Sequence, residues 1–283
     1  MKIIEKKAYG KVNLFLSVGA VREDGRHEVE TVMQRVGIYD TVTVEEAPQS
    51  GSISLVCDDA NLPVNEENIA YLAAKKYLDS TKRTQGIHIS IEKRIPVKAG
   101  MGGGSSDAAA VLIALNELYS DLNFNELAKI ASSIGADVPF FLYDTDTMLG
   151  KGTGAELYAL DVKKLDAYGV FVTYGEKLST GKMYAELDSV RGNNGTATVS
   201  SQSLISAMRD GSLDKTCKEI KNDFEQCCPT FNEVSEALTK LGSKKAFLCG
   251  SGPTVCGVFE SEEKAVKAKK LLVYPAFVCK MSN

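Results

Sequence analysis

The stretch Pro96-Val97-Lys98-Ala99-Gly100-Met101-Gly102-Gly103-Gly104-Ser105-Ser106 leads directly into a segment with helical periodicity, in which Val111, Leu112, Leu115 and Leu118 share one face. Four of the residues from 100 to 104 are glycine, so the backbone there can bend tightly and approach a ligand. The first turn of the helix presents free N–H groups and the positive end of its dipole. With hydroxyl donors from the two serines, this pattern predicts a cradle for the phosphates of a nucleotide.

A flexible surface loop would be a plainer interpretation of so many glycines. It is disfavoured because a strand-like segment at residues 87–91 and an amphipathic helix flank the loop closely. The pattern matches neither G-x-x-x-x-G-K-[ST] nor a G-x-G-x-x-G that follows a first strand. The sequence therefore predicts phosphate binding without either of these two common nucleotide folds.

Working outward from the loop, the segment from Gly10 to Val18 alternates like a strand, with Lys11 and Asn13 on the face opposite Val12 and Leu14. Asp24-Gly25 is typical of a turn. Asn125 is expected to cap a helix that ends at Gly135. Further strands are predicted near residues 29–33, 42–44, 53–55 and 87–91, and a further helix from 69 to about 78.

The second half repeats this mixture. It has a strand at 170–173, a helix ended by Gly242, short strands around Gly250-Ser251-Gly252-Pro253, and a last helix capped by Ser261. Strands and helices are segregated within each half, which favours an α+β fold in two domains over one doubly wound sheet. We expect the boundary between residues 150 and 165, giving domains 1–155 and 156–283.

The composition of the 283 residues narrows the class of protein. The net charge of −4 gives no basic stripe for nucleic acid, and no apolar run reaches the roughly 18 residues that span a bilayer. The seven cysteines form no C-x-x-C pair, so a zinc site is not expected. We expect a cytosolic protein without a resident metal, either monomer or homodimer, that acts on a small molecule.

The glycine-rich stretch resembles the second motif of the GHMP kinase superfamily. The resemblance extends to Lys11-Val12-Asn13-Leu14-Phe15-Leu16, Asp24-Gly25-Arg26-His27, Ala136-Asp137-Val138-Pro139-Phe140-Phe141, Asn222-Asp223-Phe224-Glu225 and Gly250-Ser251-Gly252-Pro253-Thr254. It covers nearly the whole chain. The K-x-N-L-F-L, D-G-x-H and A-D-V-P-F-F elements point to the member that phosphorylates a cytidine diphosphate-linked methylerythritol for isoprenoid synthesis, rather than to homoserine, galactose or mevalonate kinases.

The resemblance implies a two-domain GHMP kinase fold. Its N-terminal domain would be ribosomal protein S5 domain 2-like, and its C-terminal domain a ferredoxin-like α/β sandwich. It also implies an ATP-dependent transfer to the 2-hydroxyl group of the substrate, with Mg²⁺ arriving largely with ATP. The implied ATP-binding residues are Pro96, Gly100, Gly102, Gly103, Gly104, Ser105, Ser106 and Asn68.

Asp137 and Lys11 are the candidate catalytic residues. From the residues alone, an Asp before Val-Pro is a natural helix cap, and a lone lysine on a strand usually lies on a solvated face. The resemblance implies instead that Asp137 accepts the proton of the substrate hydroxyl, beside Lys11, which keeps the carboxylate ionised.

The implied substrate-binding residues are Asn13, Arg26, His27, Asp137, Thr180 and Tyr184. The resemblance assigns His27 to the edge of the cytosine, and Tyr184 could stack on the base or be a core aromatic. Arg26 stands where the family usually has an aromatic residue, and a guanidinium can also lie flat on a base. The resemblance places Asn68 on the adenosine side, although Asn68 could equally be a plain N-cap. The Gly250–Gly252 loop is expected either to pack against the glycine-rich stretch and help close the site or to be a tight turn between two strands.

Two other functions remain open at this stage. A divergent paralogue would keep the phosphotransfer chemistry with another small alcohol, and Arg26 is the residue that favours it. A non-catalytic nucleotide-binding protein on the same scaffold is disfavoured because both Lys11 and Asp137 are present.

Overall fold

The computed structural model describes residues 2–48, 50–176, 178–192 and 199–283. The chain forms two compact units. Unit 1 comprises residues up to Gly10, Ile38–Val97 and Gly102–Asp144, and unit 2 comprises Lys11–Gly37, Lys98–Met101 and Thr145–Asn283. Strands β1 (Ile3–Val21) and β2 (His27–Ala47) contribute residues to both units. The domain boundary expected near residue 155 divides the chain once along the sequence, whereas each of the two units is made of several segments. This boundary therefore stays a prediction.

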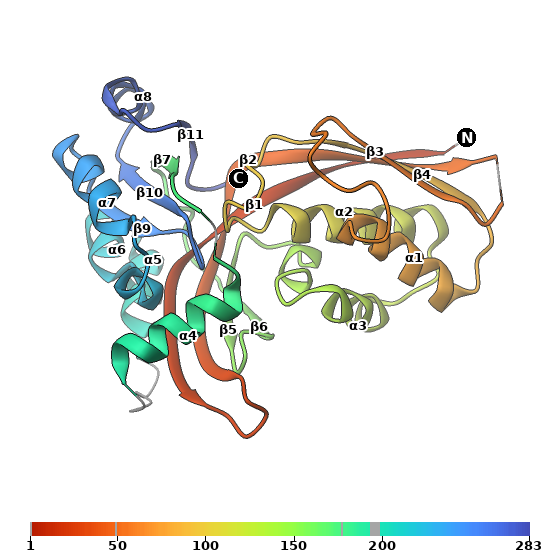
Figure 1. Cartoon of the computed structure of the whole chain (residues 1–283), viewed down its shortest axis with the longest axis horizontal. Coiled ribbons are helices and arrows are strands. Elements are labelled where there is room, and N and C mark those ends of the chain that lie inside the picture. Colours follow the sequence, from red (N-terminus) through yellow and green to blue (C-terminus); the bar gives the residue numbers. More distant parts are fainter. Residues whose placement is uncertain (1, 49, 177, 193–198) are drawn as a thin grey trace. The chain divides into compact units, whose positions relative to one another are not determined.

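In unit 1, helices lie together on one side of a sheet (Figure 1). Strand β4 pairs in parallel with β3 and antiparallel with β2. Alanines 108, 109, 110 and 114 are buried on α2, and such small side chains let α1 and the sheet approach closely. The elements are β3 (Ile53–Cys57), α1 (Ile69–Thr81), β4 (Gly86–Glu92), α2 (Gly103–Tyr119), α3 (Phe124–Ile134) and the 3₁₀ helix η1 (Pro139–Leu142).

Helix α3 corrects one expectation about caps. The helix begins at Phe124, and its N-cap is Asn123, whose side chain accepts from Glu126 N while the Glu126 carboxylate accepts from Asn123 N. This reciprocal capping box satisfies two backbone donors, which a cap at Asn125 could not do. The strands expected at 29–33 and 42–44 are likewise parts of one long strand, β2.

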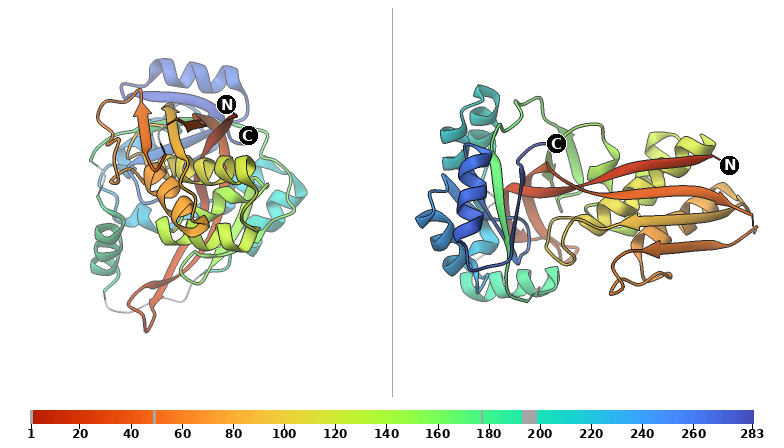
Figure 2. Two further views of the ribbon diagram at one scale, coloured as in Figure 1. Left: turned by 90° about the vertical axis from the view of Figure 1, so that its right-hand side faces the viewer. Right: turned by 90° about the horizontal axis from the view of Figure 1, so that it is seen from above.

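Unit 2 contains a four-stranded antiparallel sheet in the order β11-β7-β10-β9, and helices α7 and α8 pack against it (Figure 2). The chain order strand, helix, strand, strand, helix, strand gives the ferredoxin-like arrangement, with three helices inserted after the first strand. The sheet and its two helices are β7 (Tyr168–Thr173), α7 (Phe231–Lys240), β9 (Lys245–Leu248), β10 (Thr254–Phe259), α8 (Glu262–Leu271) and β11 (Ala276–Lys280). The other elements of unit 2 are β5 (Thr147–Lys151), β6 (Glu156–Ala159), α4 (Thr180–Arg191), α5 (Gln202–Asp210), α6 (Leu213–Glu219), β8 (Lys221–Asn222) and the 3₁₀ helix η2 (Asp223–Gln226).

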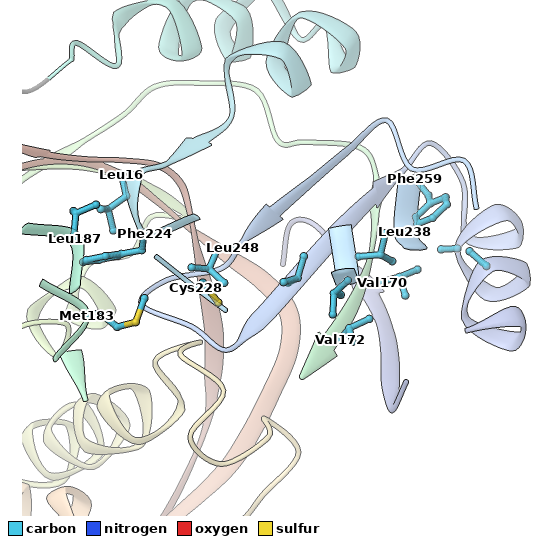
Figure 3. Packing of buried hydrophobic residues seen from close by; sticks show 14 of the residues in the cluster. Leu16, Val170, Val172, Met183, Leu187, Phe224, Cys228, Leu238, Leu248 and Phe259 are labelled. Atoms are coloured by element: carbon cyan, nitrogen blue, oxygen red, sulfur yellow. The ribbon is translucent and has the colours of Figure 1, made fainter. Parts of the chain in front are cut away.

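One hydrophobic cluster connects the parts of unit 2 (Figure 3). Val170 and Val172 lie on one face of β7, and Leu238 of α7 is buried in the same cluster. Leu16 of β1 and Leu187 of α4 belong to it as well. Each such side chain stabilises the fold by about 1.5–3 kcal/mol when fully buried. The cluster therefore fixes the end of β1 and helix α4 to the ferredoxin-like part. In the described ranges, no helix is long and apolar enough to cross a membrane.

The predicted N-D-F-E element organises the polar side of unit 2. The Asn222 amide donates to the carbonyls of Leu248 and Gly250, both at 2.8 Å, and its oxygen accepts from Phe224 N at 3.0 Å. The Glu225 carboxylate accepts from Leu248 N at 3.1 Å. These bonds fix the backbone at Leu248 and Gly250, where the chain enters the Gly250–Gly252 loop.

Asp223 makes the second set of bonds in this element. Its carboxylate accepts from Val18 N at 2.8 Å and pairs with Arg191 at 2.9 Å and Lys221 at 3.1 Å. Burial alone would raise the pKa of Asp223, but the bond from Arg191, with those from Val18 and Lys221, holds the pKa below its usual value. Arg191 also donates to the carbonyl of Val18 at 2.8 Å. Helix α4 is thereby tied to β1.

Glu225 gives the fold a testable pH dependence. Burial raises the pKa of Glu225 from 4.5 to about 7, although the bond from Leu248 N acts in the opposite direction. Between these values the folded chain binds more protons than the unfolded one, so this group lowers stability as the pH rises from about 4.5 to 7. Glu225→Gln keeps an acceptor and removes the titration. Relative to wild type, it should gain roughly 1–3 kcal/mol of unfolding free energy between pH 5 and pH 8.

The measurement is thermal or urea unfolding of both proteins across this pH range. Glu236→Gln is the matched control, because Glu236 is largely exposed and pairs with Lys240 one turn away on α7. Parallel pH profiles for wild type and Glu225→Gln would show that the buried carboxyl does not titrate as stated.

Candidate active site

Helix α2 begins in the way that the glycine-rich stretch predicts. Its N-cap is Gly102 in the left-handed region, with φ 74°, and of the residues that the structure describes none caps it with a side chain. By contrast, α1 and α3 are capped by Asn68 and Asn123. Ser106 N donates to Gly102 O at 2.8 Å, which closes the first turn. The N–H groups before Ser106 have no partner within the helix, as an anion site requires.

Close packing within unit 1 explains why glycine occupies this turn, a reason that the sequence did not reveal. A Cβ on Gly103 would lie 3.1 Å from Ile95 Cγ2 and 3.4 Å from Lys93 Nζ. A Cβ on Gly104 would touch Ile69 Cδ1 at 3.4 Å. Gly102 is needed for its positive φ. Packing against Ile95 inside unit 1 is therefore by itself a reason for glycine at position 103. Next to them Ser105 is half-buried and Ser106 buried.

A buried charge cluster holds the segment that precedes the loop. Asp40 is fully buried and accepts from the backbone N–H groups of Arg94 and Ile95 at 2.6 and 2.8 Å. The Lys93 ammonium donates to Asp40 and, at 2.8 Å, to Asp107 of α2. Burial raises the pKa of Asp107, and the Lys93 charge opposes this shift. The cluster links the chain at 93–95 to the helix that begins ten residues later.

A cleft of about 480 Å³ lies beside this cluster within unit 1. Asp58 to Asn61 line one part of it, and Lys93 to Val97, including the half-buried Pro96, line the other. Asn68, which the resemblance places on the adenosine side, caps α1 by accepting from Ala70 N at 3.0 Å and donates to Pro63 O at 2.8 Å. The plain N-cap interpretation of Asn68 is thus correct, and its role toward ATP stays a prediction.

In unit 2, Lys11 and Asn13 form a buried polar pair on β1. Each is only 4% exposed, so the solvated lysine that the strand pattern favoured is wrong. Lys11 Nζ donates to Asn13 Oδ1 at 2.7 Å, Asn13 Nδ2 donates to Thr31 Oγ1 at 2.6 Å, and Thr31 donates to the carbonyl of Phe15 at 2.7 Å. A lysine is buried to this extent only where acceptors satisfy its ammonium group. The chain of bonds fixes both side chains.

Two glycine-containing segments meet at this pair. Lys11 N donates to Met101 O and Asn13 N donates to Cys249 O, both at 2.8 Å. A Cβ on Gly100 would lie 2.5 Å from the carbonyl oxygen of Gly252, and one on Gly250 would lie 2.6 Å from the carbonyl oxygen of Gly100. The Gly250–Gly252 loop is thus both the turn between the antiparallel strands β9 and β10 and a packing partner of the glycine-rich stretch. It packs backbone to backbone against the start of the glycine-rich stretch.

The predicted substrate residues of unit 2 lie around helix α4. His27 Nε2 is 3.0 Å from Asp188 Oδ1, and the His27 ring stacks on Tyr184. Arg26 instead binds Asp24 at 2.8 Å, with a side chain that is 68% exposed. Thr180, the first residue of α4, has its hydroxyl 3.3 Å from that of Ser251. Asp188 was missed by the sequence analysis, since 161 residues separate it from His27.

Asp137 belongs to unit 1 and Lys11 to unit 2. Asp137 is half-buried in the turn after α3. The N-cap position of η1 is held by Val138, and Asp137 is the residue before it. Its catalytic role and its pairing with Lys11 stay predictions. Among the described residues, no group of three or more His, Cys, Asp or Glu side chains is placed to hold a metal ion.

Comparisons with known proteins show the family and the fold of this chain. Residues 68–145 match the GHMP kinases N terminal domain and residues 203–272 the GHMP kinases C terminal domain. The chain is thus a GHMP kinase, with the expected two-domain α+β fold. It is 40% identical over 274 residues to 4-diphosphocytidyl-2-C-methyl-D-erythritol kinase of Syntrophus aciditrophicus (strain SB), covering 94% of this chain and 93% of the relative.

A second relative with the same name, from Alkaliphilus oremlandii (strain OhILAs), is 38% identical over 273 residues, covering 95% of this chain and 92% of the relative. A crystal structure of 4-(cytidine 5'-diphospho)-2C-methyl-D-erythritol kinase superimposes with a TM-score of 0.83 at 32% identity, covering 98% of each chain. Within the GHMP kinases, this chain belongs to the 4-diphosphocytidyl-2-C-methyl-D-erythritol kinase family.

The contact between the two glycine-containing segments leads to a prediction. Gly100 has φ +76° and lies against the Gly252 carbonyl, so Gly100→Ala adds a steric clash to the backbone strain. Gly242 has φ +91° with nothing within 4 Å of a built Cβ, so Gly242→Ala adds strain alone. Gly100→Ala should lower nucleotide affinity and kcat at least about tenfold, whereas Gly242→Ala should lose roughly 1 kcal/mol of stability and keep its activity. Calorimetric titration with a nucleotide and steady-state assays of both variants test this, and equal activities would contradict it.

Proposed function

We propose that this chain transfers the γ-phosphoryl group of ATP to the 2-hydroxyl group of 4-diphosphocytidyl-2-C-methyl-D-erythritol, in the synthesis of isoprenoid precursors by the non-mevalonate route. The observation that carries the proposal is the uncapped N-terminus of α2 behind the glycine-rich stretch, with Gly102 in the left-handed region. The relatives named above, at 40% and 38% identity, support the choice of substrate.

The phosphates of ATP would bind the N–H groups of Gly103, Gly104 and Ser105 and the dipole of α2. The cleft that contains Pro96 is a suitable size for the adenosine part, at about 480 Å³. Mg²⁺, when bound, would neutralise charge on the β- and γ-phosphates. A hard cation that keeps most of its ligands from phosphate and water needs few protein carboxylates.

Transfer in this class of reaction depends on positioning and charge stabilisation rather than on covalent chemistry. We propose Asp137 as the base for the substrate hydroxyl, and the buried Lys11 as the charge that keeps Asp137 ionised, as the resemblance implies. Asn13, fixed by Lys11 and Thr31, is proposed to contact the methylerythritol part. Thr180 is proposed to contact the substrate beside Ser251, and His27 to read the base edge.

We place this reaction in the cytosol, because all seven cysteines are free thiols, which suits a reducing compartment. The first experiment is ATP turnover with and without the cytidyl substrate, in the presence of Mg²⁺. Turnover that depends on this substrate supports the proposal. Brisk turnover of a simple alcohol and none of the cytidyl compound would move the assignment to a divergent paralogue.

Asp137→Asn tests the base directly. The amide keeps the size and a hydrogen-bonding oxygen but cannot accept the proton, so kcat should fall by roughly 10²–10⁴-fold. The melting temperature should change little, because the amide keeps the size and one hydrogen-bonding oxygen of the side chain, and the N-cap position of η1 is Val138. Steady-state kinetics and thermal unfolding of the same preparation separate the two effects. A variant that loses stability but keeps its turnover per folded molecule would assign Asp137 a structural role.

A further inference from the structure

Helix α4 contacts His27 from two directions. His27 is the first residue of β2, directly after the turn at Asp24-Gly25. Its Nε2 lies 3.0 Å from Asp188 Oδ1. Its ring stacks nearly parallel on Tyr184, with centroids 4.8 Å apart and an interplanar angle of 14°. Tyr184 and Asp188 are four residues apart, so they share one face of α4. The stacking fixes the plane of the imidazole, and the hydrogen bond fixes its rotation within that plane.

The helix that supplies these contacts is itself anchored. Its Met183 and Leu187 are buried in the hydrophobic cluster, and Arg191 binds both the carbonyl of Val18 and Asp223. The Tyr184 ring rests edge-on against Phe224, with centroids 5.0 Å apart and an interplanar angle of 82°. The His27 side chain is only 10% exposed. The Asp188 side chain is 48% exposed, so burial of His27 and its stack on Tyr184 hold the ring, and the carboxylate sets the rotation of the ring in its plane.

The bond to Asp188 selects one form of the imidazole. An ionised carboxylate can only accept hydrogen bonds, so the proton of a neutral His27 lies on Nε2 and the lone pair on Nδ1. We infer that Asp188 is a positioning residue that presents Nδ1 of His27 as a hydrogen-bond acceptor, and so selects a base that carries an exocyclic amino group. The inference rests on the proposed function, in which His27 meets the edge of the base.

Cytosine and uracil differ at the group that such an acceptor reads. The 4-amino group of cytosine donates a hydrogen bond, whereas the 4-carbonyl oxygen of uracil only accepts one. With Asp188 in place, the amino group pairs with Nδ1, and a carbonyl oxygen would face a lone pair and lose its hydrogen bond to water. Tyr184 then supports the imidazole. A base that stacked on the same face of Tyr184 would have to displace His27.

Nitrogen NMR tests the form of the imidazole without any substrate. The chain has only two histidines, His27 and His88, so the ¹⁵N imidazole spectrum contains two ring systems, and His88→Gln assigns them. His88 Nδ1 lies 2.8 Å from Ser54 Oγ on another pair of strands and serves as an internal reference. In wild type the neutral His27 should carry its proton on Nε2. Asp188→Ala should shift His27 toward a mixture of both forms, and Asp188→Glu should restore the Nε2–H form.

Kinetics with the cytidine substrate and its uridine analogue test the consequence. In Asp188→Ala the ratio of kcat/KM for cytidine over uridine should fall roughly tenfold, about the effect of one hydrogen bond, mainly through KM. Asp188→Glu should recover most of this ratio. Asp210→Ala, which removes an exposed ion pair between the end of α5 and Lys215 of α6, should leave the ratio unchanged.

The outcomes separate this inference from the proposed function. A shift of the His27 tautomer together with a fall in the base ratio supports the inference. An unchanged tautomer in Asp188→Ala overturns it, and so does a shifted tautomer with an unchanged ratio. If the tautomer shifts but neither nucleotide substrate is turned over by any of the proteins, the positioning role of Asp188 stands and the proposed substrate is wrong.

Discussion

The candidate site in unit 2 depends on a contact between two backbones. The carbonyl of Gly252 occupies the place where a Cβ of Gly100 would be, and the carbonyl of Gly100 occupies the corresponding place at Gly250. Two segments that touch in this way cannot carry side chains at the contact, so glycine is the residue that permits the arrangement. The backbone N–H groups of Lys11 and Asn13 then donate to the neighbouring carbonyls in these two segments, those of Met101 and Cys249.

Buried charge supports the flank of the glycine-rich stretch in unit 1 and the junction of β1 with α4 in unit 2, in opposite senses. In unit 1 a cation, Lys93, lies between the carboxylates of Asp40 and Asp107. In unit 2 an anion, Asp223, lies between Arg191 and Lys221. Segments rich in glycine offer few side chains for packing, and hydrogen-bonded ion pairs in their flanks can fix their position instead. Such clusters contribute little net stability when complete, but removing one partner leaves an uncompensated buried charge, which is costly.

Features encoded by neighbouring residues were predictable, and features made by distant ones were not. The uncapped start of α2 follows from the glycines next to it, and the segregation of strands and helices was enough for the α+β class. The burial of Lys11 could not be predicted from the sequence of β1 alone. The segments that cover this part of β1, at Met101 and Cys249, lie far away in the sequence. The Asp188 contact of His27 has the same origin. The expected N-cap of α3 at Asn125 was a local error of prediction. Both Asn123 and Asn125 are suitable N-cap residues, and only the reciprocal bond with Glu126 distinguishes Asn123.

The division of β1 and β2 between the two units has a consequence for how the chain is made. Residues 11–37 leave the ribosome early, yet they belong to a unit whose other main segment begins at Thr145. Val18 N, for example, meets its acceptor on Asp223 only 205 residues later. Until then the apolar side chains of Leu16 and Val18 lack most of the hydrophobic cluster to which they belong. Even when β1 pairs with β2, which follows it directly in the chain, the nascent chain exposes this apolar surface through most of synthesis, and intermediates with exposed hydrophobic surface are prone to aggregate.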